Sequence, residues 1–227
     1  MNRWFRRTPR EPFIEDYFEA TPKRIAGKTP LADLRFSVLD AETTGFDVAK
    51  DRMLSLAVVD VKGGRIGMAS LSAWVVYQNA MPATPAVAVH GILPADTARG
   101  RREDEVLRDL LPRLAGAIIA GHHVGFDVAM INAALKRHHG VTLRNPLLDT
   151  AQFAMKAIDA FGKTGYPGQS APTLDEVCAL CGITPVERHT AEGDAFTTAV
   201  LLVTLCTRLQ KKLGRLPRAG DLPLIRS

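Results

Sequence analysis

The order in which strand-like and helix-like segments follow one another constrains the fold of this chain most. Residues 36–40 and 53–60 are short apolar runs typical of buried strands, and a third strand is expected to end at residues 74–77. The two glycines of residues 62–65 favour a tight hairpin turn between the second and third strands. The first half of the chain therefore predicts three antiparallel strands in sequence order.

Beyond residue 100 the pattern changes to alternating strands and helices. Apolar residues recur with a helical period over residues 102–114, 126–136, 151–158 and about 190–213. Short apolar strands are expected at 117–120 and 146–149, and strands separated by crossover helices run parallel. Thr173 is followed three residues later by Glu176, which predicts the N-cap of a further helix. We therefore expect an α/β fold with a mixed five-stranded sheet, three strands antiparallel and two parallel, flanked by helices.

The chain divides into a domain and two smaller ends. It has 227 residues, of which 46% are hydrophobic, and this is enough for one domain with a sizeable core. We expect an N-terminal arm over residues 1–34 with one short helix, a domain over 35–213 and a short basic tail over 214–227. The arm is expected to dock on the domain, with nucleic acid or a protein partner as alternatives. No apolar run reaches the length of a membrane span, so no membrane association is expected.

Charge is spread unevenly along the chain. The net charge is +5, but residues 1–10 hold four arginines and no acid, and residues 208–227 hold six basic residues against one acid. The segment between them is therefore net acidic. Binding to nucleic acid by charge alone does not explain an acidic centre, so the central acids need a purpose of their own.

The three cysteines indicate a reducing compartment. Their number is odd and small, which disfavours a disulfide framework and favours a cytoplasmic location. Cys178 and Cys181 are spaced as in many zinc and redox sites, but no second pair of cysteines follows. We expect core packing for this pair, with a metal or redox role as the alternative.

Two carboxylates close the first predicted strand. Asp40 and Glu42 are two residues apart, so an extended strand directs both to the same face. Two adjacent carboxylates repel each other unless a cation lies between them, and oxygen ligands favour hard divalent cations. The alternative is that these acids only cap the turn that follows the strand.

Three further residues have weak meaning alone. Asp127 begins a predicted helix after another buried strand, where an acid is favoured by the helix dipole alone. His189 and Asp194 are five residues apart at the start of the last helix. They can flank one site if His189 lies in the entry loop and Asp194 in the first helical turn.

Taken together, these segments resemble the DnaQ-like 3′–5′ exonucleases. The segments are Asp40-Ala-Glu42-Thr-Thr-Gly45, then His122-x-x-x-Phe-Asp127, then His189-x-Ala-x-x-Asp194. Their order resembles the three exonuclease motifs, and the histidine five residues before the last Asp resembles the DEDDh subgroup. Segments 89–92, 148–150 and 174–183 also resemble family markers, so the likeness covers about residues 35–210. It implies a ribonuclease H-like fold and kinship with the proofreading exonuclease domains of bacterial replicative DNA polymerases.

The resemblance also implies roles for individual residues. Asp40, Glu42, Asp127 and Asp194 would hold two divalent cations, Mg²⁺ or Mn²⁺, with Asp40 touching both. His189 would act as the general base on the attacking water. The implied substrate contacts are Thr43, Thr44, Gly45, His90, Gly91, His122 and Phe126. One departure is His123, where the family usually has Asn.

The expected activity is release of nucleoside monophosphates from the 3′ end of nucleic acid, with DNA favoured. Two alternatives remain, an RNA-trimming enzyme of the same family and a nucleic-acid-binding module without catalysis. A polymerase or other protein partner is a further possibility. Only about 14 residues follow the last predicted helix, which leaves little room for a tether to a polymerase.

Overall fold

The computed structural model describes residues 10–79, 90–162 and 170–226, and within them six strands form one sheet. The strands are β1 (Arg35–Thr43), β2 (Met53–Lys62), β3 (Arg65–Val75), β4 (Ile118–Gly121), β5 (Pro146–Asp149) and β6 (Ile225–Arg226). Their spatial order is β3-β2-β1-β4-β5-β6. The first three strands pair antiparallel, and β1, β4 and β5 pair parallel. The expected mixed five-stranded sheet is confirmed, and β6 extends it beyond β5 as an antiparallel edge.

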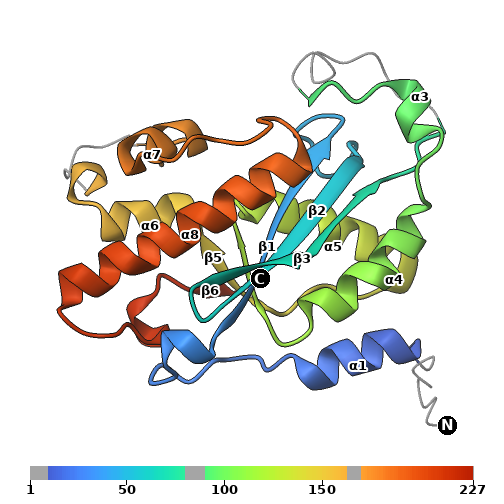
Figure 1. Cartoon of the computed structure of the whole chain (residues 1–227). Helices are drawn as coiled ribbons and strands as arrows, with labels where there is room; N and C mark the ends of the chain where they lie inside the picture. The colour runs from blue at the N-terminus through green and yellow to red at the C-terminus, as the bar shows by residue number, and fades with distance from the viewer. Residues whose placement is uncertain (1–9, 80–89, 163–169, 227) are drawn as a thin grey trace, which may run out of the picture.

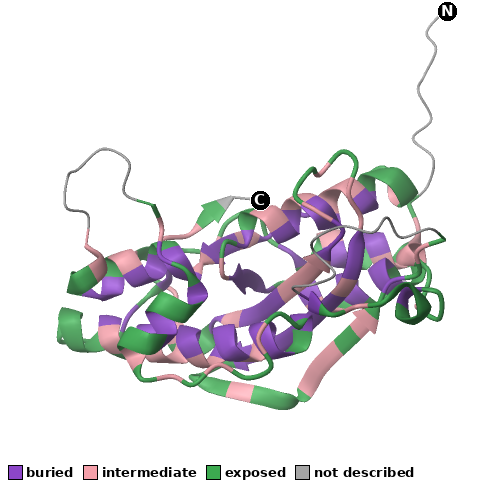
Figure 2. Ribbon diagram, turned by 90° about the horizontal axis from the view of Figure 1, so that it is seen from above, coloured by how far each residue is buried: buried purple, intermediate pink, exposed green. Residues whose placement is uncertain are grey.

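Helices cover both faces of the sheet (Figure 1). They are α1 (Pro12–Ala20), α3 (Pro94–Thr97), α4 (Glu103–Leu114), α5 (Gly125–His139), α6 (Thr150–Ala157), α7 (Leu174–Cys181) and α8 (Ala191–Leu213). Short 3-10 turns lie at Leu31–Asp33, Asp159–Phe161 and Ala219–Asp221. One hydrophobic cluster joins the sheet to α1, α4 and α5, and a second joins it to α6, α7 and α8. The buried residues of Figure 2 accordingly lie between the sheet and its two helical layers.

Alternate residues of β1 face opposite layers. Leu39 belongs to the cluster under α4 and α5, whereas Phe36 and Val38 belong to the cluster under α8. Asp40 and Glu42 continue the phase of Phe36 and Val38, because side chains alternate along a strand. The strand therefore directs both carboxylates toward the α8 side of the sheet.

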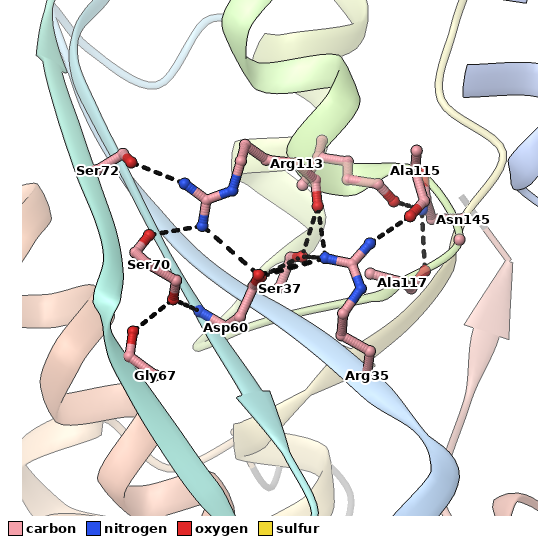
Figure 3. A network of polar contacts seen from close by, with 12 residues as sticks. Arg35, Ser37, Asp60, Gly67, Ser70, Ser72, Arg113, Ala115, Ala117 and Asn145 are labelled. Carbon is pink, nitrogen blue, oxygen red and sulfur yellow. Dashed lines mark hydrogen bonds and ion pairs between the residues drawn. The ribbon is translucent and has the colours of Figure 1, made fainter. Parts of the chain in front are cut away.

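A polar network fixes the end of β1 opposite to Asp40 (Figure 3). Arg35 donates to the carbonyl oxygen of Arg113 at 2.9 Å and also to that of Ala115. Asn145 donates to the carbonyl oxygens of Leu114 and Ala117 at 2.7 and 2.9 Å. Carbonyl groups at the C-terminal end of a helix have no partner within the helix. These side chains satisfy them and tie α4 to the sheet.

Both ends of the chain contribute to this structure. The side chain of Tyr17 on α1 is buried, and its hydroxyl donates to Asn145 Oδ1 at 2.5 Å. The backbone N–H of Arg144 donates to the same hydroxyl at 2.9 Å. The arm's helix thus docks on the domain. At the other end, the tail supplies β6, which pairs with β5.

Several smaller expectations also have an outcome. The Thr173 hydroxyl accepts from the Glu176 backbone N–H, so the predicted cap of α7 is confirmed. Cys178 is buried in the core beside a free Cys181, as expected. Among the described residues no helix is long and apolar enough to cross a membrane. The expectations for Arg3, Arg6, Arg7 and Val89 concern residues outside the described ranges.

Candidate active site

Three carboxylates meet where the C-terminal end of β1 approaches the first turn of α8. Asp40 and Glu42 come from β1, and Asp194 comes from α8. One carboxylate oxygen from each of the three lies within 4.8 Å of the others. Thr190 caps α8 by accepting the Gly193 N–H at 3.0 Å, which places Asp194 in the first helical turn. Residues more than 150 positions apart in the sequence thus form one acidic cluster.

Asp127 adds a fourth carboxylate from the opposite layer. It lies in the first turn of α5 and is 6% exposed. Its carboxylate accepts a backbone hydrogen bond from Ala41, the residue between Asp40 and Glu42. Asp127 therefore reaches β1 from the α5 side, while Asp194 reaches it from the α8 side.

Burial and mutual repulsion raise the pKa values of Asp40, Glu42 and Asp127. Burial is the largest cause for Asp40, whose pKa lies well above its usual value, and the charge of Asp127 is the next largest. Burial and the charge of Asp194 raise the pKa of Glu42 to about 7. Burial likewise raises the pKa of Asp127. A nearby positive charge stabilises the ionised form of such carboxylates.

The acidic cluster fits a hard divalent cation. All of its donor atoms are carboxylate oxygens, which are the ligands that Mg²⁺ and Mn²⁺ prefer. A cation between Asp40, Glu42 and Asp194 would offset the repulsion among the three carboxylates, which contributes to the raised pKa values of Asp40 and Glu42. The family implied by the sequence and the donor set of the structure thus point to the same kind of ligand.

The loop before α8 holds the fifth expected catalytic residue, His189. This residue is exposed, and its backbone N–H donates to Asp194 Oδ2 at 3.1 Å. Its φ is 64°, and that of Glu187 is 41°, so two residues of this loop adopt the left-handed conformation. A Cβ at Gly193 would lie 2.3 Å from the carbonyl oxygen of Val186, so glycine permits the close approach of the loop to α8.

Sequence reasoning missed Arg188, which lies between Glu187 and His189. Its guanidinium forms an ion pair with Asp194 through Nη1. Its Nε also donates to Asp175 Oδ1 at 2.6 Å, at the start of α7. Arg188 therefore places a positive charge against the acidic cluster. Its position next to His189 in the third motif was the available signal.

The turn after β1 is tightly ordered. Thr43 Oγ1 donates to the carbonyl oxygen of Gly45 at 2.8 Å, and Thr44 Oγ1 donates to Asp51 at 2.7 Å. A Cβ on Gly45 would lie 2.6 Å from the Asp51 carboxylate. Phe46 follows and is 89% exposed, with its ring 5.7 Å from that of Phe126. Sequence reasoning included Phe126 but missed Phe46, although it directly follows the first motif.

A pocket of about 360 Å³ lies beside the acids, between β2, β3 and the start of α8. Its lining includes Ser55, Trp74, His90, Thr190 and Glu192. Ser55 pairs with Glu42 across the β1–β2 ladder, so the pocket adjoins the acidic cluster. His90 Nδ1 accepts the Ile92 N–H at 3.1 Å, and its buried Nε2 has no hydrogen-bond partner among the described residues. Gly91 has a φ of 67°, which suits glycine.

Both ring nitrogens of His122 have hydrogen-bond partners. Nε2 is 2.9 Å from the Pro172 carbonyl oxygen, and Nδ1 is 2.9 Å from Thr150 Oγ1. Because a carbonyl oxygen only accepts, Nε2 carries the proton. Burial is the largest cause that lowers the pKa of His122 to about 4. In this geometry the ring joins β4, α6 and the segment before α7.

The chain is similar to known exonucleases in sequence and in fold. Residues 37–202 match the family model described as Exonuclease. DNA polymerase III subunit epsilon of Aquifex aeolicus is 31% identical over 196 residues, covering 86% of this chain and 92% of that protein. A PolC-type DNA polymerase III of Thermotoga maritima is 24% identical, with 90% of this chain matching 14% of the polymerase.

Solved structures agree in fold. Exonuclease I of E. coli in complex with a dT13 oligonucleotide superposes with a TM-score of 0.63 at 21% identity. The match covers 80% of this chain and 43% of exonuclease I. At this identity the likeness concerns the fold, which is the ribonuclease H-like sheet with helices on both faces.

Proposed function

This chain belongs to the exonuclease family and is a 3′–5′ exonuclease, and from that premise we propose that it removes nucleotides from the 3′ end of DNA by a two-metal mechanism. The single observation that carries the mechanism is the convergence of Asp40, Glu42 and Asp194, with Asp127 adjoining them. Phosphodiester hydrolysis is slow because an anion resists attack by water. A site that concentrates cations at four acids is suited to this problem.

The proposed ligands are the four acids. Asp40, Glu42 and Asp194 would hold one Mg²⁺ or Mn²⁺ ion, and Asp40 with Asp127 would hold the second. When bound, such ions supply Lewis-acid stabilisation of the charge that develops on the phosphodiester. His189, at the exposed edge of the cluster, would accept the proton of the attacking water.

Two features near the acids suit a nucleotide. His90 Nε2 carries the ring proton because Nδ1 accepts the Ile92 N–H, so a buried donor with no hydrogen-bond partner among the described residues lines the pocket beside Glu42. An unpaired buried donor is costly, and a substrate oxygen would satisfy it. Phe46 and Phe126 present neighbouring rings on which bases would stack.

DNA is the favoured substrate because the Aquifex aeolicus relative, 92% of which aligns with this chain, is named a subunit of DNA polymerase III. RNA is the alternative. The decisive comparison is digestion of single-stranded DNA, duplex DNA and RNA of one sequence, with Mg²⁺ and with Mn²⁺. Faster removal from RNA than from both DNA forms would overturn the DNA assignment.

Association with a polymerase is also proposed, because the Aquifex aeolicus relative is named a subunit of DNA polymerase III. Co-elution with a polymerase subunit in size-exclusion chromatography would test this association.

The C-terminal basic residues are remote from the acids. Leu213 ends α8 about 30 Å from Asp194, at 1.5 Å per helical residue. Lys212 and Arg215 there form ion pairs with Asp159 and Asp221, respectively. A salt-dependent hold on a substrate backbone near the acids would therefore involve other residues.

Asp40→Asn tests the catalytic role of the acids. This change keeps the shape of the side chain and removes a charge that its neighbours repel. Nucleotide release should fall at least about 100-fold, while the melting temperature without metal should stay equal or rise. Asp109→Asn, on the outer face of α4, is the control and should keep full activity. Normal turnover in Asp40→Asn would refute the proposed mechanism.

A further inference from the structure

Arg188 connects the acidic cluster to α7. Its Nε and Nη2 donate to the two carboxylate oxygens of Asp175 at 2.6 and 3.3 Å, and Nη1 contacts Asp194. The Asp194 side chain is only 8% exposed, whereas that of Asp175 is 61% exposed. One guanidinium therefore joins a buried carboxylate of the site to a carboxylate at the surface.

Both oxygens of Asp194 already have donors. Oδ1 accepts from Arg188, and Oδ2 accepts from the His189 N–H at 3.1 Å. A divalent cation at the cluster needs an oxygen of Asp194 as a ligand. It would also be repelled by a guanidinium in contact with that carboxylate, because like charges at short range repel strongly in a partly buried site.

We propose that Arg188 is a built-in counter-cation of the acidic cluster and competes with the divalent cation for Asp194. When the divalent cation displaces Arg188 from Asp194, Asp175 keeps the guanidinium in place. The inference rests on the proposed metal-dependent function. It gives Asp175 a role that no motif suggests. With Asp175 present, Arg188 keeps two charge-assisted hydrogen bonds after leaving Asp194. Replacing Arg188 by the divalent cation at Asp194 therefore costs less free energy than it would without Asp175.

The structure supports Arg188 in this place in two further ways. The positive charge of Arg188 lowers the pKa values of Asp40 and Glu42, against the causes that raise them. The backbone on either side of Arg188 is left-handed, at Glu187 and His189. Such conformations are costly for residues other than glycine and persist only where the surroundings impose them. Gly193 admits this loop to within contact of α8.

Mn²⁺ binding to the full chain, measured by isothermal titration calorimetry, tests the proposal through two opposite changes. Arg188→Gln removes the competitor and should bind Mn²⁺ about tenfold more tightly, since a hydrogen bond to a charged group no longer has to be broken. Asp175→Asn leaves Arg188 with Asp194 as its only carboxylate, so Mn²⁺ should bind several-fold more weakly. In the double variant the effect of Asp175→Asn should disappear.

The control is Arg101→Gln. Arg101 forms an ion pair at 2.6 Å with Asp109 of α4, so this change removes the same charge from an exposed pair that includes none of the four site acids. Its Mn²⁺ affinity should equal that of the unchanged protein. An equal gain of affinity in Arg101→Gln would assign the effect to net charge and overturn the proposal.

Thermal unfolding supplies a second readout. With chelator, Arg188→Gln should melt at a lower temperature than the unchanged chain, and saturating Mn²⁺ should remove that deficit. Equal Mn²⁺ affinities in the unchanged chain, Arg188→Gln and Asp175→Asn would overturn the inference and leave the proposed function standing. No Mn²⁺ binding to the unchanged chain would instead refute the proposed function. If Arg188→Gln does not fold, unchanged affinity in Asp175→Asn overturns the inference by itself.

Discussion

At the scale of single residues, Gly193 allows the loop that holds His189 to pack closely against the start of α8. An added Cβ would lie 2.3 and 2.4 Å from the carbonyl oxygens of Val186 and Glu187, which are backbone atoms that cannot swing aside. Gly193→Ala should therefore displace the loop that holds His189 and lower kcat about 100-fold, as misplaced catalytic groups do. Gly125→Ala is the matched control in the first turn of α5, where an added Cβ meets nothing within 4 Å. Steady-state kinetics of both variants measure this effect, and a normal kcat in Gly193→Ala would contradict it.

At the scale of elements, α1 depends on Tyr17 for its attachment. Tyr17→Phe removes the donor to Asn145 and the acceptor of the Arg144 N–H, which leaves buried polar groups unpaired. The free energy of unfolding should fall by about 1 to 3 kcal/mol, with nucleotide release at permissive temperature unchanged. Tyr77→Phe is the control because Tyr77 is exposed, and it should change stability by less than about 0.5 kcal/mol. Denaturant titration of both variants decides the matter, and equal stabilities would show that the docking of α1 does not rest on this hydroxyl.

At the scale of the whole molecule, His122 makes the stability of the fold decrease as the pH falls. The pKa of folded His122 is lowered to about 4 from an ordinary value of 6.5, so the unfolded chain gains a proton first as the pH falls. Stability should therefore be lost between pH 6.5 and 4, by roughly 2 to 3 kcal/mol. The raised pKa values of the site carboxylates act in the opposite sense, so the difference between the unchanged chain and His122→Gln isolates this residue. Denaturant titrations across this pH range should give His122→Gln the flatter profile, and parallel profiles would contradict the assignment.

The sequence by itself determined the mixed sheet and the position of the acids along the chain. Strand alternation placed Asp40 and Glu42 on one face, and the Thr173–Glu176 spacing located the start of α7. These features are local, because they follow from the period of a strand or a helix and from short-range capping. The role of each expected site residue stays a prediction until the variants above are measured.

Only the tertiary structure decided which distant groups share a charge environment. The contact of Arg188 with both Asp175 and Asp194 joins two helices, and the Asp127–Ala41 hydrogen bond joins α5 to β1. The partners of His122 come from α6 and from the segment before α7. No periodicity encodes such contacts, because they depend on how helices cross a sheet rather than on the spacing within one element. For the same reason, the raised pKa of Glu42 follows only from the tertiary structure, which buries this carboxylate and brings Asp194 of α8 to the end of β1.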